Sequence, residues 1–252
     1  MVQFRDTALI LAGHGSTQNA NSSRYTRQTA HHIRERDIFG EVRSAFWKEQ
    51  PSYADALRGL KSRKVVVVPW FLANGYFTTK VLAREFADVS GCECRLTDPI
   101  GSRPEILAHL QKRAARLLAA RGWHPSQVSL LLASHGTPLH KGSREAASGL
   151  VEQMATDGYR RARAVFLEEE PRIADWKKHA AEGPVVVLPH FLAGGLHGSE
   201  DVPELLGIQG SAEQWYRVEN AEIGYGEPLG RPEEMEDVIV DLAMDRLRDV
   251  RT

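Results

Sequence analysis

Three polar residues of types that bind metals or move protons follow short apolar segments in the second half of the chain. His135 follows "LLLAS", Glu168 follows "RAVFL", and His197 follows "VVVLPHFLAGGL". Imidazole binds first-row transition metals, and a neighbouring carboxylate can ligate the ion or orient the ring. The same groups can also act as acids and bases near neutral pH. Singly, each is equally typical of a hydrogen-bonded residue at a strand end; together they indicate a metal or proton-transfer site.

Alternating strand-like and helix-like segments determine where these polar residues lie. The expected strands are 7–13, 42–48 and 65–69 in the first half and 128–134, 162–168 and 185–189 in the second. Helical patterns cover 22–36, 51–60, 143–155 and 171–180. Strands without polar alternation are typical of parallel sheets that helices cover on both faces. Since ligands bind at the carboxyl ends of such strands, His135, Glu168 and segment 190–197 should meet at one edge.

The two halves are copies of one another. "LILAGHGS" (9–16) matches "LLLASHGT" (130–137), and "RSAFWKEQPSYADAL" (43–57) matches "RAVFLEEEPRIADWK" (163–177). "VVVVPWFLANGYF" (65–77) matches "VVVLPHFLAGGLH" (185–197), and "TDPIGSRPEI" (97–106) resembles "GEPLGRPEEM" (226–235). The order and nearly constant spacing of these blocks indicate a duplicated domain. We therefore predict an α/β protein of two tandem, pseudo-symmetric, doubly wound parallel-sheet domains, 1–123 and 124–252, facing a central cleft. Helices over 103–121 and 231–250 should complete the respective domains.

Composition and missing motifs exclude several classes of function. Lys and Arg number 32 against 33 Asp and Glu, so the chain lacks the basic field of nucleic-acid-binding proteins. No apolar segment approaches the roughly 20 residues of a membrane span, and the N-terminal apolar run is too short for a secretory signal. We therefore expect a cytoplasmic protein with no membrane partner.

Two further absences concern nucleotides and cysteine-bound metals. "GHGSTQ" has Gln18 where a dinucleotide fingerprint has its third glycine, and no phosphate-binding loop motif occurs. No nucleotide is therefore expected. The only cysteines, Cys92 and Cys94, are too few for a four-cysteine zinc site and are interpreted as incidental thiols.

The second half resembles the sirohydrochlorin chelatase family of class II tetrapyrrole metal chelatases. The motifs that carry the resemblance are "SHGT" (134–137), "VFLEEEP" (165–171) and "LPHFLAGGLHGSEDVP" (188–203), and the first half shares "GHGS", "FWKEQP" and "VPWFLANG". The resemblance implies a lyase that inserts divalent cobalt, iron or nickel, as substrate, into sirohydrochlorin or a related tetrapyrrole without ATP. It also implies a place in siroheme or cobalamin biosynthesis and a monomer that is an internal pseudo-dimer. The alternative is a non-catalytic tetrapyrrole or metal carrier on the same fold.

Carried over by position, the resemblance makes His135 and His197 the metal ligands, with Glu168 as a catalytic partner. The matching first-half positions hold His14, Phe77 and Lys48. That copy has lost one imidazole and exchanged the carboxylate for a cation, so its site is expected to be partly degenerate. His14 is a secondary catalytic candidate.

The resemblance also implies residues that bind the tetrapyrrole. Gly194 and Gly195 would let the backbone approach a flat macrocycle, and His190 would form a wall of the cleft. Cations near strand ends could meet the substrate carboxylates: Lys141 above all, with Lys80, Arg144 and Arg24 as further candidates.

Overall fold

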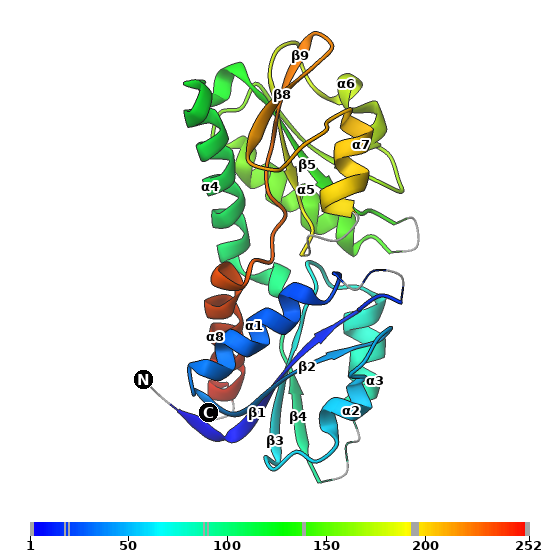
Figure 1. Cartoon of the computed structure of the whole chain (residues 1–252), viewed down its shortest axis with the longest axis vertical. Coiled ribbons are helices and arrows are strands. Elements are labelled where there is room, and N and C mark those ends of the chain that lie inside the picture. The colour runs from blue at the N-terminus through cyan, green and yellow to red at the C-terminus, as the bar shows by residue number, and fades with distance from the viewer. Residues whose placement is uncertain are drawn as a thin grey trace. The chain divides into compact units, whose positions relative to one another are not determined.

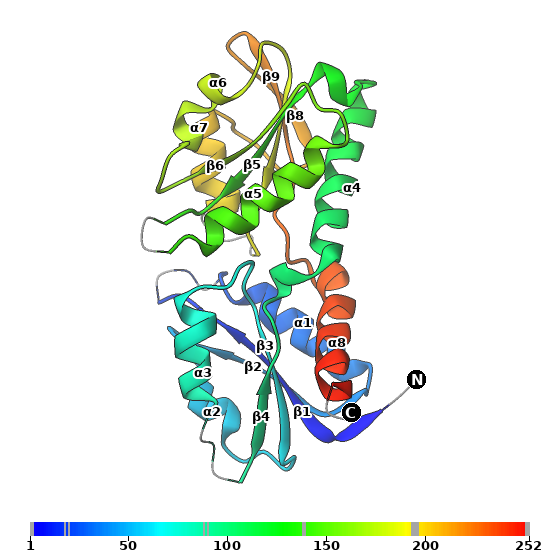
Figure 2. The ribbon, with the colours of Figure 1, turned by 180° about the vertical axis from the view of Figure 1, so that it is seen from behind.

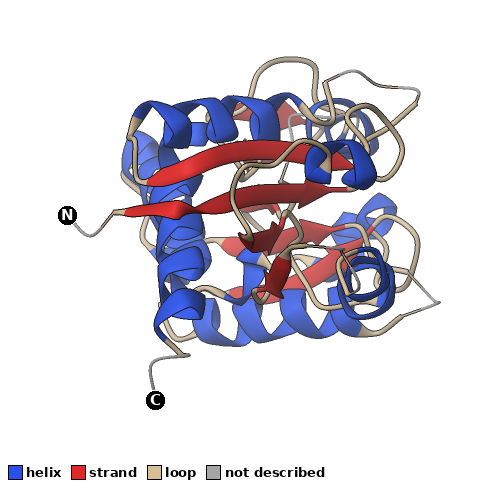
Figure 3. Cartoon of the chain, turned by 90° about the horizontal axis from the view of Figure 1, so that it is seen from below, coloured by secondary structure: helices blue, strands red, loops and turns tan. Residues whose placement is uncertain are grey.

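The structure is a computed structural model that describes residues 3–17, 19, 21–87, 89, 91–137, 140–192 and 197–249, the side chains of His197 and Ser199 excepted. The chain forms two compact units, Met1–Arg103 with Gly230–Thr252, and Pro104–Leu229 (Figure 1). Each unit is an α/β sheet domain, which confirms the fold class predicted from the sequence. Figure 3 shows the strands lying between helices.

The first unit is built on a four-stranded parallel sheet of order β2-β1-β3-β4. Its strands are β1 (Phe4–Gly13), β2 (Phe39–Phe46), β3 (Lys64–Pro69) and β4 (Glu93–Leu96). Its helices are α1 (Arg24–Glu35), α2 (Tyr53–Leu57), α3 (Leu82–Glu85) and α8 (Pro232–Arg248), with a π-helical turn at Phe77–Val81 and a 3-10 turn at Ile100–Ser102. α1 and α8 lie on one face of the sheet and α2 and α3 on the other (Figures 1 and 2).

The second unit has a five-stranded sheet of order β6-β5-β7-β9-β8. Its strands are β5 (Ser129–Ser134), β6 (Arg161–Phe166), β7 (Val185–Pro189), β8 (Gln214–Val218) and β9 (Ala221–Tyr225). Its helices are α4 (Pro104–Arg121), α5 (Gly142–Ala155), α6 (Trp176–His179) and α7 (Val202–Leu206), with 3-10 turns at Pro125–Gln127 and Ile173–Asp175 and a π-helical turn at His197–Asp201. The sheet is not wholly parallel as predicted, because β8 pairs antiparallel with β9 through a tight turn after Val218.

The central strands of both sheets form because their residues are apolar on both faces. Val65–Val68 of β3 and Val185–Leu188 of β7 are buried throughout, as expected for strands that helices cover on both sides. In the second unit, Trp176 of α6 and Leu206 of α7 pack on one face in the same core cluster as Leu131. This packing fixes the strand ends from which the polar residues emerge.

The two sequence repeats exchange their C-terminal helices between the compact units. α4 follows the first repeat in sequence, yet its Leu117 carbonyl accepts a hydrogen bond from Trp215 Nε1 of β8 at 2.8 Å. α8 follows the second repeat, yet its Asp237 Oδ1 receives Arg36 Nη1 of the first unit at 2.7 Å. The expectation that each terminal helix completes its own repeat, giving units 1–123 and 124–252, therefore differs from the compact units. An apolar helix face specifies that a helix is buried but not on which sheet.

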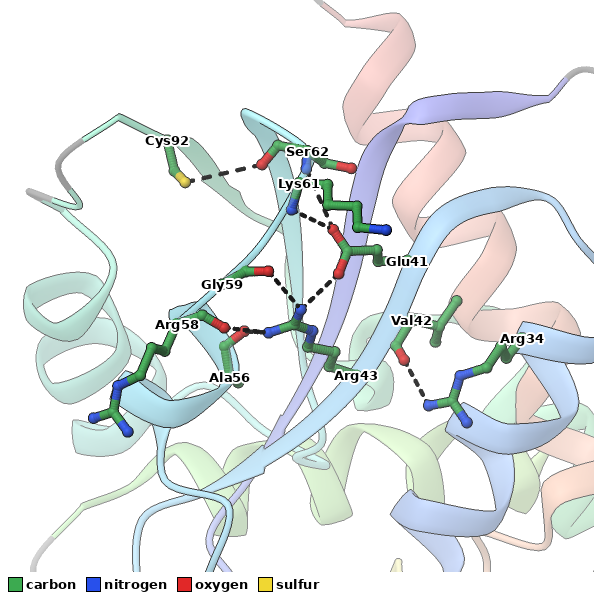
Figure 4. A network of polar contacts seen from close by, with 10 residues as sticks. All are labelled: Arg34, Glu41, Val42, Arg43, Ala56, Arg58, Gly59, Lys61, Ser62 and Cys92. Atoms are coloured by element: carbon green, nitrogen blue, oxygen red, sulfur yellow. Dashed lines mark hydrogen bonds and ion pairs between the residues drawn. The ribbon is translucent and has the colours of Figure 1, made fainter.

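A polar network ties β2 to the connection between α2 and β3 (Figure 4). Glu41 Oε1 accepts the Lys61 N–H at 2.7 Å, and Arg43 donates to Glu41 Oε2 at 2.6 Å and to the Arg58 carbonyl at 2.8 Å. Burial opposes ionisation of Glu41, but these donors prevail and hold the pKa of its carboxyl below the ordinary value. The network forms near the amino end of β2, so it braces the sheet away from the site residues.

The longest helices of the fold cover its sheets. Within the described residues, none of the helices combines the length and apolar composition needed to cross a membrane.

Candidate metal site

The candidate site residues of the second unit follow the carboxyl ends of three neighbouring strands. β5 ends at Ser134, β6 at Phe166 and β7 at Pro189, and both β6 and β7 pair in parallel with β5. His135 and Glu168 therefore leave adjacent strands on the same side. The Glu168 N–H donates to the His135 carbonyl at 3.2 Å, which joins the two loops directly.

His135 and Glu168 point their side chains toward one another. His135 Nε2 lies 3.8 Å from Glu168 Oε1, and the two side chains are 42% and 55% exposed. That separation exceeds hydrogen-bonding distance. Two ligands bound about 2.1 Å from one ion at a tetrahedral angle lie about 3.4 Å apart. The pair is therefore spaced much like two ligands of an ion, and both side chains are partly exposed to solvent.

The tautomer of His135 is fixed by its own loop. Its Nδ1 lies 2.7 Å from the Gly136 carbonyl oxygen, and a carbonyl can only accept, so Nδ1 carries the proton. In the neutral ring the lone pair is then on Nε2, the atom that faces Glu168. A histidine whose second nitrogen donates to a carbonyl is the arrangement typical of metal-binding imidazoles.

A second carboxylate, that of Glu169, is hydrogen-bonded to the loop that carries His135. Glu169 Oε1 accepts the Thr137 N–H at 3.1 Å, and Arg144 Nε donates to Glu169 Oε2 at 3.0 Å. Arg144 also donates to the Glu170 carbonyl at 2.8 Å, and its guanidinium lies 5.3 Å from the Phe166 ring centroid. Arg144, considered from the sequence as a cation for substrate carboxylates, is thus engaged within the protein as a positioning residue.

Sequence reasoning missed Glu169 and treated its partner Arg144 as a cation for the substrate, although a signal for Glu169 was present. Glu49 and Glu169 occupy matching positions of "WKEQP" and "LEEEP", whereas the neighbouring position differs. In the first unit, Arg27 Nη2 donates to Glu49 Oε1 at 3.1 Å. Both copies thus have the carboxylate that supports the loop, Glu49 or Glu169, whereas the position before it holds Lys48 in one copy and Glu168 in the other.

Gly136 is a point where this frame admits no side chain. Its φ is +67°, and an added Cβ would lie 2.7 Å from Phe166 Cβ and 2.8 Å from Glu169 Cγ. We expect Gly136→Ala to lower the free energy of unfolding by roughly 2–4 kcal/mol, from left-handed strain and overpacking together. It should also displace His135 and reduce metal affinity, as measured by denaturant unfolding and cobalt titration.

Gly122→Ala is the matched control for that substitution. Gly122 has a φ of +66° with nothing within 4 Å of an added Cβ. Its cost should be limited to the strain, about 1–2 kcal/mol, with metal affinity unchanged. Equal losses in the two variants would show that contact with Phe166 and Glu169 does not matter.

The first unit keeps the frame but not the histidine–carboxylate pair. His14 Nδ1 lies 2.9 Å from the Gly15 carbonyl oxygen, so this imidazole has the same tautomer as His135. The residue beside it, however, is Lys48, which is exposed. The His14 and Phe77 ring centroids are 4.6 Å apart in an edge-to-face contact. A cation and a phenyl ring thus stand where the second repeat has Glu168 and His197.

His197 begins a π-helical turn, His197–Asp201, and Phe77 begins the matching turn Phe77–Val81. π-Helical turns are frequent at functional sites. The buried Tyr225 hydroxyl donates to the Gly198 carbonyl at 2.7 Å and so anchors the turn to β9. The His197 side chain, Gly194 and Gly195 lie outside the described residues. Among the side chains that are described, no group of three or more His, Cys, Asp or Glu residues is gathered for a metal ion.

His190 lies in the interior rather than on an exposed wall. It is 4% exposed, and its Nδ1 lies 3.3 Å from Ser134 Oγ. Burial lowers the pKa of His190 to about 4, so this ring is neutral at physiological pH. In the first unit Trp70 matches His190 and Gly13 matches Ser134. The larger side chain at one position is thus accompanied by a smaller residue at the other.

Lys141 lies at the start of α5 and is exposed. Its carbonyl accepts the Glu145 N–H at 2.9 Å, which begins the helix. The structure therefore places this cation in the loop region that follows β5, as the strand-end reasoning requires, while its contact with a substrate stays a prediction.

Fold and site together define a class: two-repeat α/β proteins of chelatase-like architecture, with an open histidine–carboxylate pair at the strand ends of one repeat. The CbiX family model matches residues 8–117 and 129–246, one match in each repeat. The chain belongs to the CbiX family of sirohydrochlorin chelatases, which confirms the resemblance carried by its motifs.

Known relatives agree with this assignment. The chain is 32% identical over 221 residues to the Halobacterium salinarum protein named "Probable sirohydrochlorin cobaltochelatase", covering 78% of this chain and 75% of that protein. DR2241 from Deinococcus radiodurans, a multi-domain protein with structural similarity to chelatases, matches with a TM-score of 0.72 and 26% identity over 94% of this chain, which spans 54% of that structure. The sirohydrochlorin chelatase SirB from Bacillus subtilis subspecies spizizenii, in complex with cobalt, matches with a TM-score of 0.66 and 12% identity over 97% of each chain, which shows a shared fold.

Proposed function

We propose that the chain inserts a divalent metal ion, with cobalt the first choice, into sirohydrochlorin as an ATP-independent chelatase of the lyase class. The observation that carries the proposal is the His135–Glu168 pair, with Nε2 and Oε1 3.8 Å apart and the tautomer fixed by Gly136. The relatives' names supply the substrate and the metal. The second repeat is the working copy, and a single chain in the cytoplasm is the functional unit.

The proposed reaction exchanges one dication for two protons. His135 Nε2 and the His197 imidazole hold the metal substrate on one side and leave its other positions open, since a closed site would not release the ion. Glu168 accepts the two pyrrole N–H protons one after the other and passes each to solvent as the metal–nitrogen bonds form. Two protons leave for each divalent ion that enters, so charge is conserved, and the proposed scheme contains no nucleotide.

The internal repeat supports the assignment of His197 to this site. Phe77 begins the turn that matches the one begun by His197, and the centroid of its ring lies 4.6 Å from that of the His14 ring. By the same correspondence, a side chain at position 197 should reach the ring of His135. This supports the assignment of His197 as the second imidazole of the proposed site.

Anaerobic incubation of sirohydrochlorin with the chain and Co²⁺, Fe²⁺ or Ni²⁺, without ATP, tests the function. We expect the tetrapyrrole absorption bands to shift faster than without protein, and Glu168→Gln to slow the shift by roughly 10²-fold, as for loss of a general base. Glu152→Gln, an exposed carboxylate later in α5, is the matched control and should keep the wild-type rate. Tight binding of both substrates without acceleration would identify a carrier instead.

A further inference from the structure

The first unit carries a cluster of aromatic rings at the ends of its strands. Phe77 is its centre: its ring centroid lies 4.6 Å from that of His14 and 6.1 Å from those of Trp47, Phe71 and Tyr76. The Phe71 and Phe77 rings are nearly parallel, with an interplanar angle of 14°. We call these five residues the aromatic cluster. They come from the segments after β1, β2 and β3, which match the segments that carry His135, Glu168 and His197 in the second repeat.

Much of the aromatic cluster faces solvent. Trp47 is 38% exposed and Tyr76 is 51% exposed, and within the described residues the only other exposed large apolar side chain is Leu205. Exposed aromatic rings that gather in one place, rather than singly, indicate a binding surface. The other tryptophan and tyrosine side chains are less exposed than these two.

The exposed rings are not a property of the frame that the repeats share. The second repeat has Leu167 at the position of Trp47 and Leu196 at that of Tyr76. Two aliphatic residues thus stand where the first repeat has large planar rings. The repeat without the histidine–carboxylate pair is thus the one whose sequence has two more aromatic residues at these positions.

Cations accompany the aromatic cluster. Lys48 follows Trp47 directly, and its N–H donates to the His14 carbonyl at 2.8 Å, so it lies beside the cluster. Lys80 is part of the π-helical turn that Phe77 begins. Both are exposed, and neither has an ion-pair partner among the described residues. Arg27 in the same unit, by contrast, is held by Glu49. Two lysines are therefore available to an external anion.

We infer that the aromatic cluster binds the face of a planar tetrapyrrole, with Lys48 and Lys80 meeting its peripheral carboxylates. The inference rests on the proposed function and deepens it by giving the degenerate repeat the task of substrate binding. Offset and edge-to-face contacts favour a flat conjugated ring over an aliphatic ligand, and lysine ammonium groups favour carboxylates. Together these two features match a macrocycle with a flat apolar centre and an acidic rim.

Titration of the full chain with metal-free sirohydrochlorin, followed by calorimetry, tests the inference. Trp47→Leu and Tyr76→Leu each place the residue of the second repeat at the matching position, and we expect each to weaken binding roughly 5- to 10-fold. Trp47→Phe should retain most of the affinity, because a flat ring remains. Lys48→Gln should weaken binding and reduce its dependence on salt. Leu205→Ala, the exposed aliphatic control, should bind as the wild type does.

Cobalt affinity, measured without tetrapyrrole, should be unchanged in all of these variants, which separates loss of the surface from loss of folding. Wild-type affinity in both Trp47→Leu and Tyr76→Leu would overturn the inference while leaving the chelatase function intact. Equal losses in Trp47→Phe and Trp47→Leu would overturn the role of ring stacking. Failure of the wild-type chain to bind sirohydrochlorin at all would instead overturn the proposed function.

Discussion

His197→Ala should nearly abolish metal insertion. The substitution removes one of the two proposed imidazole ligands, and among the described residues no other His, Cys, Asp or Glu joins His135 and Glu168 in a group that could replace it. Loss of about 3–4 kcal/mol of transition-state stabilisation slows a reaction by roughly 10²–10³. The measurement is the rate of the tetrapyrrole band shift at saturating cobalt and sirohydrochlorin. Cobalt affinity should fall in parallel.

The matching position in the first repeat is the comparison for His197. Phe77→Ala should raise the Michaelis constant for the tetrapyrrole and largely preserve the turnover number, because it removes binding rather than chemistry. His14→Ala resolves the role of the remaining imidazole: a small effect makes the first repeat a scaffold, and a collapse in turnover makes His14 a catalytic partner. Loss of turnover in both first-repeat variants, with retention in His197→Ala, would mean that the chemistry belongs to the other half.

The pairing of His135 with Glu168 could be predicted because it depends on local rules. Each residue directly follows a buried strand, and β5 and β6 are neighbours in a parallel sheet. The carboxyl ends of neighbouring parallel strands meet at one edge whatever the rest of the chain does. The repeat also allows two neighbouring positions to be compared. Glu168 is replaced by Lys48 in the first repeat, whereas Glu169 is matched by Glu49.

Other features depend on contacts between distant segments, which residue patterns do not specify. α4 and α8 each have an apolar face, but only the assembled sheets decide that Leu117 meets Trp215 and that Asp237 meets Arg36. His190 was expected to form a wall of the cleft, and its burial, with Nδ1 3.3 Å from Ser134 Oγ, follows from packing that residue patterns do not specify. The antiparallel pairing of β8 with β9 likewise follows from a tight turn within a segment that carries no strong periodicity.

A second metal site should form in the first repeat when Lys48→Glu and Phe77→His are combined. The frame for it is already present: His14 has its proton held at Nδ1 by the Gly15 carbonyl, and Glu49 is held by Arg27, as in the second repeat. Phe77 already contacts the His14 ring at 4.6 Å, so an imidazole there should reach the same ion. We expect cobalt titration, followed by calorimetry and by visible absorption, to show a second equivalent bound.

Each single substitution is the control for the pair, because the site proposed for the second repeat has both a second imidazole and a carboxylate in place of the Lys48 cation. Lys48→Glu alone offers one imidazole and one carboxylate, and Phe77→His alone places two imidazoles beside a lysine ammonium that repels a dication. Both should bind the second equivalent much more weakly than the combined variant, and His14→Ala in the combined background should remove it. An unchanged stoichiometry in a folded double variant would show that the frame shared by the repeats does not suffice to build the site. The assignment of Glu168 and His197 as the residues that make the second repeat the working copy would then lose its support.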